Sequence, residues 1–197
     1  MGNYFISPIY ELAKNNKKIG IINHPFGAPT AGAVIEELAD NGCRKIIACG
    51  TAGVLDKKIS KGEIVIPNEA VRDEGTSYHY IKPDEKAVPH PKAVDTVIKT
   101  CQKNKLSFRT GKTWTTDAIF RETKNIIAKR KNKGCVTVEM EGAAFFAASK
   151  LKNIMTAQIL YALDDISGPK WNKRTKLKPR ITMEKVFWLA VESCFKL

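Results

Sequence analysis

Two glutamates separated by a single residue give this chain its clearest potential for chemistry. Glu139 and Glu141 flank Met140 in the run TVEMEGAA, residues 137–144. A carboxylate can accept two hydrogen bonds from a vicinal diol, such as the 2′- and 3′-hydroxyls of a ribose. A thioether beside it offers a soft apolar contact for a sugar ring. The alternative is a pair of solvated acids at a helix N-terminus, where negative charge is favourable in any case.

The elements around this acidic pair place it at the end of a strand. The apolar residues 135–138 predict a buried strand, and residues 142–150 predict a helix. Open α/β sheets bind their ligands at the carboxyl ends of strands. The position of the pair therefore agrees with its potential for binding a diol.

Strands and helices alternate along the rest of the chain. Residues 18–23, 29–41 and 45–49 predict a strand, a helix and a strand, with Pro29 in the first helical turn and Gly42 at the C-terminal cap. Such a βαβ unit implies parallel strands and a right-handed crossover. Further strands are predicted at 63–67, 107–114 and 154–163, further helices at 91–104, 121–131 and 181–195, and loops at 83–91 and 168–179. The alternation predicts a single α/β domain over residues 1–197.

Composition narrows the class of protein. Hydrophobic residues make up 43% of the 197 and charged residues 27%, as in ordinary globular proteins. No apolar run is long enough for a membrane span, and residues 1–10 lack the layout of a signal peptide. The five cysteines have no C-x-x-C spacing, which is typical of reduced thiols, so a cytoplasmic protein is expected. The three histidines are too scattered to predict a metal site.

The formal net charge of +13 raises the question of a polyanionic partner. Basic residues concentrate at 57–61, 124–133 and 170–180, with Trp171 the only aromatic of note among them. Because no nucleic-acid-binding motif accompanies these runs, a solvated basic surface is the favoured interpretation over nucleic-acid binding. Such a surface would also concentrate phosphate and other anions.

Several blocks of the sequence resemble one family, in that family's order. VEMEGAA resembles the signature of the nucleoside phosphorylases, which include uridine phosphorylase, the hexameric purine nucleoside phosphorylases and the methylthioadenosine/adenosylhomocysteine nucleosidases. The other blocks are GAPT at 27–30 with EEL at 36–38, GTAG at 50–53, KGEIVI at 61–66, VRDEGTSY at 71–78 and TTD at 115–117. The resemblance implies a three-layer α/β sandwich around a central mixed β-sheet. It also implies an oligomer, a dimer or higher and possibly a hexamer.

The resemblance implies a role for each candidate near the sugar and the base. Glu141 would hold the ribose diol, Met140 would pack against the sugar, and Glu139 would bind the ribose or support Glu141. Asp164 and Asp165 would lie at the base, where purine-cleaving members use an aspartate to assist protonation of N7. Leu163 replaces the serine that usually precedes it, and a solvated acidic turn is the alternative.

The remaining candidates lie at the edge of the implied pocket. Ile119 and Phe120 would lie beside the base, although they fit a core equally well. Tyr78 would reach a neighbouring subunit's pocket, and packing on a strand is the alternative. The glutamine and arginine pair with which uridine phosphorylases read uracil is absent between residues 117 and 129.

The source of the nucleophile stays open in the sequence. Inorganic phosphate, as co-substrate, would meet Gly27, Gly50 and Thr51, with no other cofactor implied. Ala48 stands where phosphorolytic members carry an arginine. The first strand and G-D-P-x-R loop that usually precede Lys18 are also missing, so the chain is either a short member or a fragment. Phosphorolysis of a purine ribonucleoside is the leading expectation, with hydrolysis of the same bond, or a non-catalytic binding module or relic, as alternatives.

Overall fold

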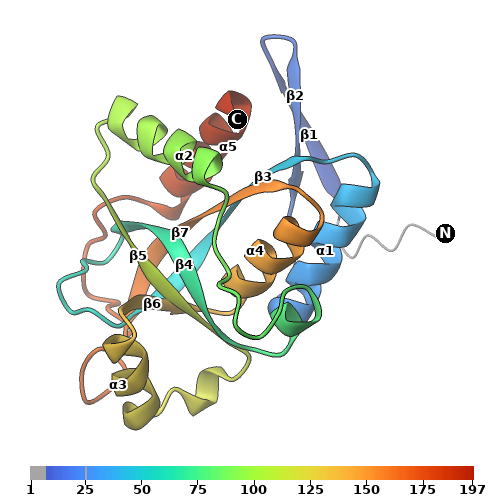
Figure 1. The fold of residues 1–197 in the computed structure, drawn as a ribbon. Helices are drawn as coiled ribbons and strands as arrows, with labels where there is room; N and C mark the ends of the chain where they lie inside the picture. The colour runs from blue at the N-terminus through green and yellow to red at the C-terminus, as the bar shows by residue number, and fades with distance from the viewer. Residues whose placement is uncertain (1–7, 25) are drawn as a thin grey trace.

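The computed structural model describes residues 8–24 and 26–197. Residues 1–7, which include most of the start considered above for a signal peptide, and residue 25 lie outside the described part. The described chain is an α/β domain with a central mixed sheet and helices on both sides, so the expected fold class is confirmed (Figure 1). No helix in the described ranges is long and apolar enough to cross a membrane.

The central sheet curls until it closes on itself. Its strands follow the order β3-β6-β5-β4-β7 around a closed barrel. β3 runs parallel to β7, and β5 runs parallel to both β4 and β6, whereas the β3–β6 and β4–β7 pairs are antiparallel. The strands are β3 (Lys45–Val54), β4 (Ile64–Asp73), β5 (Phe108–Thr116), β6 (Cys135–Glu139) and β7 (Met155–Asp165).

Several strands extend further than the sequence predicts. The residues 50–53, expected as a loop, form the last part of β3. Small side chains make this possible, because a Cβ on Gly53 would lie only 3.0 Å from the Val138 side chain of β6. β4 continues past Pro67, where its pairing with β5 shifts register, since proline cannot donate to the sheet ladder.

The predicted strand at 18–23 belongs to a hairpin instead of the barrel. β1 (Ile9–Lys14) and β2 (Lys17–Ile22) pair with each other and project from the body of the domain (Figure 1). Asn15 and Asn16 form the turn with φ of 50° and 60°, a left-handed conformation that asparagine tolerates and type I′ hairpin turns require. In the described chain no ladder joins β2 to β3, so the pairing of the strands does not test the predicted βαβ unit.

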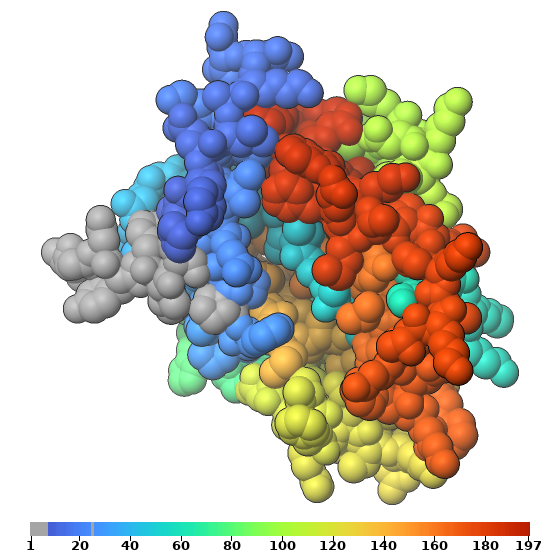
Figure 2. All heavy atoms as spheres, turned by 180° about the vertical axis from the view of Figure 1, so that it is seen from behind, coloured from blue at the N-terminus to red at the C-terminus, as the bar shows by residue number. Residues whose placement is uncertain are grey.

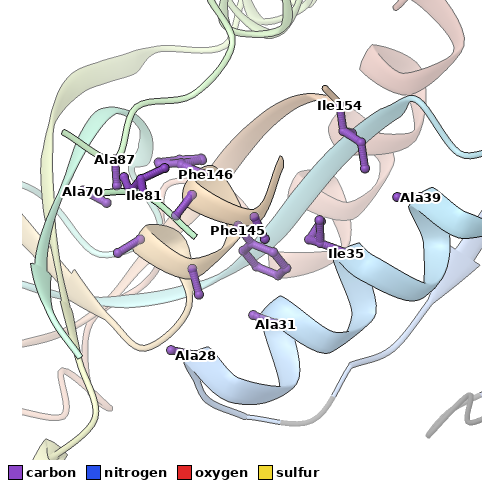
Figure 3. Packing of buried hydrophobic residues seen from close by; sticks show 14 residues of the cluster. Ala28, Ala31, Ile35, Ala39, Ala70, Ile81, Ala87, Phe145, Phe146 and Ile154 are labelled. Atoms are coloured by element: carbon purple, nitrogen blue, oxygen red, sulfur yellow. The ribbon is translucent and has the colours of Figure 1, made fainter. Parts of the chain in front are cut away.

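Two helices cover one side of the barrel. α1 (Ala28–Asp40) and α4 (Gly142–Leu151) pack together through small side chains, among them Ala28, Ala31 and Ala144, around Phe145 and Phe146 (Figure 3). The alanines let the two helices approach closely, while Phe145 lies between α4 and α1 and Phe146 lies near Ala70 of β4 (Figure 3). The segment with the two glutamates is thereby fixed against the start of α4.

Three further helices complete the domain. α2 (Pro91–Lys103) and α5 (Met183–Lys196) cover a second apolar cluster that includes Ile159 of β7. α3 (Lys124–Asn132) begins three residues later than predicted, because residues 119–121 form a 3-10 turn. Its Arg130 lies over the buried Trp114 ring at 5.5 Å and pairs with Asp73 at 2.6 Å.

The α1–α4 packing predicts a large cost for emptying its centre. Phe146 is 1% exposed, so Phe146→Ala should lower the free energy of unfolding by about 3–5 kcal/mol. Leu151→Ala, at a 59% exposed position of the same helix, should change it by less than about 0.5 kcal/mol. Urea unfolding with an unchanged m-value measures both, and equal losses in the two variants would contradict this description of the core.

Candidate functional site

Glu139 is buried beneath the start of α4, and its carboxylate accepts four hydrogen bonds. Oε2 accepts hydrogen bonds from the backbone N–H groups of Glu141 at 2.9 Å and Gly142 at 2.6 Å, and from Gln158 Nε2 at 3.2 Å. Oε1 accepts from the Thr115 hydroxyl at 2.6 Å. This set of partners makes Glu139 the clamp that turns the chain from β6 into α4.

Two further features tighten this clamp. Thr115 also accepts a hydrogen bond from the Ala143 N–H at 2.9 Å, so β5 holds the first turn of the helix. A Cβ on Gly142 would lie 3.0 Å from Glu139 Oε1, which explains why the backbone here needs glycine. Burial raises the pKa of Glu139, and the nearby charge of Glu141 adds to this, whereas the Thr115 and backbone hydrogen bonds lower it.

Glu141 points away from the clamp and toward the start of α1. Its Oε1 accepts a hydrogen bond from the Gly27 N–H at 2.7 Å. Gly27 has φ of +99°, a conformation that L side chains rarely adopt, and it precedes Pro29 in the first turn of the helix. Burial raises the pKa of Glu141, and the Gly27 hydrogen bond opposes the shift. A backbone hydrogen bond from Met140 to the half-buried carboxylate lowers its pKa as well.

Asp164 and Asp165 lie at the end of β7 but make different contacts. Asp164 Oδ2 accepts a hydrogen bond from Trp171 Nε1 at 2.6 Å. Its carboxylate lies over Gly53, where an added Cβ would be 3.5 Å from Oδ1 and 3.0 Å from the Val138 side chain. The ends of β3, β6 and β7 therefore meet at Asp164, and β6 leads to Glu139 and Glu141.

Asp165 anchors the following loop. Its Oδ2 pairs with Arg174 at 2.8 Å, its Oδ1 accepts from the Ser167 N–H at 2.8 Å, and its backbone pairs in both directions with Asn172. Burial alone would raise the pKa of Asp165, but the hydrogen bonds from Ser167 and Arg174 outweigh it and lower the pKa. Asp165 therefore holds the following loop, whereas the neighbouring Asp164 accepts a hydrogen bond from a tryptophan.

Glu122 is a candidate that the sequence does not reveal. It follows the 3-10 turn at 119–121, and burial, followed by the negative charge of Asp164, raises its pKa to about 7. A carboxyl group with that pKa can give up a proton near neutral pH. The only sequence signal was its place inside the basic helix predicted at 121–131, which does not suggest an acid. Trp171 was noted above only as an aromatic among basic residues, and no sequence pattern indicated its hydrogen bond to Asp164.

The predicted apolar contacts for a base are exposed. Ile119 is 46% exposed and Phe120 is 96% exposed, which excludes both from the core of this chain. Trp171 is 62% exposed even though its ring nitrogen is bonded to Asp164. Ile119 and Phe120 come shortly before Glu122 in the sequence, and Trp171 comes shortly after Asp164. Large apolar side chains are therefore exposed close in sequence to both acids.

The predicted residues Gly50, Thr51 and Tyr78 make no hydrogen bond to these carboxylates among the described contacts. Gly50 and Thr51 are exposed on β3, and a Cβ on Gly50 would meet no atom within 4 Å. Tyr78 is 46% exposed, with the Arg72 guanidinium 3.9 Å from the centre of its ring. Arg72 is itself held by carbonyl groups of the 81–85 loop. Met140 is half-buried between the two glutamates.

No group of three or more His, Cys, Asp or Glu side chains within residues 8–24 and 26–197 is arranged to hold a metal ion.

The raised pKa of Glu122 predicts a pH-dependent effect on stability. The unfolded chain ionises this group near 4.5 and the native state near 7, so the native state binds more protons between these values. The stability contributed by the neutral carboxyl is fully present below the unfolded pKa and is lost as pH rises through about 7. Glu122→Gln cannot ionise, so its stability relative to the unmodified chain should rise between about pH 5 and about pH 8.

Urea unfolding across this pH range checks the expectation. Glu184→Gln, at an exposed position of α5, serves as the matched control, and its difference from the unmodified chain should stay nearly constant. A Glu122→Gln difference that is flat with pH, or that falls as pH rises, would show that Glu122 does not carry the raised pKa.

Known proteins resemble this chain both in sequence and in fold. An uncharacterized protein, R802, of Acanthamoeba polyphaga mimivirus is 32% identical over 137 residues, which cover 70% of this chain and 53% of the viral protein. A guanosine phosphorylase of Halorubrum lacusprofundi is 26% identical over 161 residues, covering 76% of this chain and 67% of that protein. The purine nucleoside phosphorylase of Plasmodium falciparum is 29% identical over 189 residues, 92% of this chain and 75% of that protein. The chain thus spans about half the length of its viral relative.

Solved structures share the fold. A P. knowlesi homologue of P. falciparum PNP superposes with a TM-score of 0.80 at 24% identity, covering 95% of this chain and 76% of that chain. An AMP nucleosidase from Bacteroides thetaiotaomicron superposes with a TM-score of 0.77 at 18% identity, covering 90% and 71%. The sequence model of the phosphorylase superfamily matches residues 3–180. The chain also has the fold of these two solved structures. Because the family match covers most of the chain, the protein is a member of the phosphorylase superfamily.

Proposed function

We propose that this chain binds a purine ribonucleoside and transfers its ribose from the base to inorganic phosphate, releasing the free base and ribose 1-phosphate. The observation that carries the proposal is the half-buried Glu141 carboxylate, which is held at the strand end by the Gly27 N–H at 2.7 Å. A carboxylate has about four acceptor positions, so one held in this way can also accept hydrogen bonds from sugar hydroxyls. The names of the guanosine and purine nucleoside phosphorylases among its relatives support the same reaction class.

Glu141 would contribute in two ways. It would accept the hydrogen bonds of the ribose diol and so fix the sugar relative to the site. Its negative charge would also stabilise the positive charge that grows on the sugar as the N-glycosidic bond breaks, as in other glycoside cleavage. Since Glu139 already uses both oxygens on Thr115, Gln158 and backbone groups, its role is to position Glu141.

The proposed purine preference rests on two acids, Glu122 and Asp164, the second of which lies at the end of β7. A departing purine needs a proton or a hydrogen bond at N7. Glu122, with a pKa raised to about 7, would supply the proton, and Asp164 would orient it or receive the hydrogen bond. The exposed rings of Phe120 and Trp171 would stack against the base. Uracil has no N7, which makes uridine the poorer substrate.

Hydrolysis of the same bond is the second candidate. The residue Ala48 leaves β3 without a guanidinium near Thr51, and phosphate carries about two charges that fixed cations would normally offset. The fold is also shared with an AMP nucleosidase. Phosphate would meet only the Thr51 hydroxyl and nearby N–H groups, so we propose weak phosphate binding, with a dissociation constant of about 1 mM or higher.

A diol-specific comparison tests the role of Glu141. Glu141→Gln keeps the shape and removes the charge, so affinity for inosine should weaken by about 1.5–3 kcal/mol, the range for a charged hydrogen bond. Affinity for 2′,3′-dideoxyinosine, which lacks both hydroxyls, should be nearly the same in the two proteins. Titration calorimetry measures this, with Glu184→Gln as control. An equal loss for both ligands would place Glu141 away from the diol.

Product analysis tests the nucleophile. With inosine as substrate, ribose 1-phosphate should replace free ribose as phosphate is raised from zero. Thr51→Val removes the hydroxyl at constant shape and should raise the KM for phosphate about tenfold, the effect of one hydrogen bond to a charged group. Thr110→Val, at an exposed position of β5, is the matched control. Ribose release independent of phosphate would establish the hydrolase, and faster cleavage of uridine than of inosine would refute the purine preference.

A further inference from the structure

Three basic segments that lie far apart in the sequence gather at one end of the molecule. They are residues 57–61, 124–133 and 170–180, which together hold 14 of the 33 lysine and arginine residues and no aspartate or glutamate. Figure 2 shows the loop that contains 170–180 (orange) beside the region of α3 (yellow), and Figure 1 shows the same two neighbours from the front. We name the surface formed by the three segments the basic face.

Hydrogen bonds tie the first segment to the third. Lys61 donates through Nζ to the Arg174 carbonyl at 2.9 Å, and the Arg180 N–H donates to the Lys61 carbonyl at 2.9 Å. The Arg174 guanidinium in turn donates to the Ile59 carbonyl at 2.9 Å. The loop after β7 therefore lies along the segment between β3 and β4.

The second segment is placed by the apolar side of its helix. Ile126 and Ile127 of α3 pack against a buried cluster that includes Leu55, shortly before the first segment, and Ile166, shortly before the third. The exposed residues of α3 are lysines, asparagines and one alanine. Because the isoleucines are turned inward, the outward side of the helix presents mainly positive charge.

Few of these charges are neutralised within the molecule. Arg130 pairs with Asp73 at 2.6 Å, and Arg174 pairs with Asp165 at 2.8 Å. No other lysine or arginine of the basic face has a salt bridge to any residue that the structure describes. Like charges gathered in this way repel one another, so a polyanion bound across them would relieve the repulsion.

An exposed ring lies among these charges and narrows the class of polyanion. Trp171 is 62% exposed, and Lys173 Nζ lies 4.9 Å from the centre of its ring. Proteins hold single-stranded nucleic acid with such a combination, since bases stack on the ring and phosphates pair with the cations. A lipid surface fits less well, because inserting Trp171 would carry the Asp164 carboxylate, bonded to its Nε1 at 2.6 Å, toward the acyl chains.

We propose that the basic face binds single-stranded nucleic acid over about ten nucleotides, through its phosphates and through a base stacked on Trp171. The segments taken one by one in the sequence favoured a solvated surface, and their assembly at one end is what supports a polyanionic partner. Binding of this kind breaks no bond, so it does not depend on the reaction proposed above.

Fluorescence anisotropy on the whole chain tests the binding, with an end-labelled dodecamer of uridylate as probe. This probe contains no purine, so the proposed cleavage would not consume it. Its affinity should fall steeply as the KCl concentration rises. Replacing Lys58, Lys129 and Lys176 together by Gln removes one exposed charge from each segment, and should weaken binding by about tenfold or more at low salt. The slope of log affinity against log salt should become shallower by about 2.

A matched variant removes the same net charge elsewhere. Lys14, Lys92 and Lys105 are exposed on the hairpin and at or just beyond the ends of α2, and none has a salt bridge in the described part of the chain. Replacing these three by Gln should leave the affinity within about twofold. An equal loss in both triple variants would show that the net charge alone attracts the probe, and would overturn the assignment to the basic face.

Variants of the ring test the stacking. Trp171→Ala should weaken binding by about fivefold or more with the salt slope unchanged, whereas Trp171→Phe keeps a ring and should bind nearly as the unmodified chain does. Trp188→Ala, at a 51% exposed position of α5, should have no effect. Three results would overturn the proposal: undiminished binding by Trp171→Ala, equally tight binding of a duplex of the same length, or equally tight binding of phosphatidylserine vesicles.

Discussion

The arrangement of the site depends on one buried carboxylate. Glu139 collects hydrogen bonds from β5, from β7 and from the first backbone N–H groups of α4. A buried carboxylate is stable only when its oxygens are satisfied in this way, and removing one partner leaves a costly unpaired group. The direction in which the chain leaves β6, and hence the position of Glu141, follows from these contacts. The Gly27 turn and the start of α1 are then fixed through the Glu141–Gly27 hydrogen bond.

The sequence predicted the parts of the structure that depend on local pattern. The apolar run before Glu139 and the small residues after Gly142 define a strand and a helix, and both lie where expected. The helices beginning near Pro29 and Pro91 were also predicted closely, since proline and the polar caps mark their ends. The hairpin at Asn15 and Asn16 was missed, because the turn signal was not weighed against a single apolar strand.

Other features arise only from contacts between distant segments. The closure of the sheet requires β6 to meet β3, and no local pattern encodes that pairing. The raised pKa of Glu122 needs burial and the charge of Asp164, some forty residues away in sequence. Asp164 and Asp165 look equivalent in sequence, and only Trp171 and Arg174 distinguish them. The role of Glu139 as a clamp likewise became clear only with Thr115 and Gln158 in place.

The barrel closes through a very short seam. The antiparallel strands β3 and β6 pair only at Gly53–Val138 and Val54–Thr137, and the antiparallel β4–β7 ladder is equally short, whereas the parallel neighbours share longer ladders. A ladder of two pairs is the cheapest part of a sheet to open locally. Asp164 lies over Gly53 on one side of this seam, and Glu139 and Glu141 follow Val138 on the other. Local opening of this seam would therefore change the separation between Asp164 and the Glu139–Glu141 segment, while each side keeps its own internal hydrogen bonds.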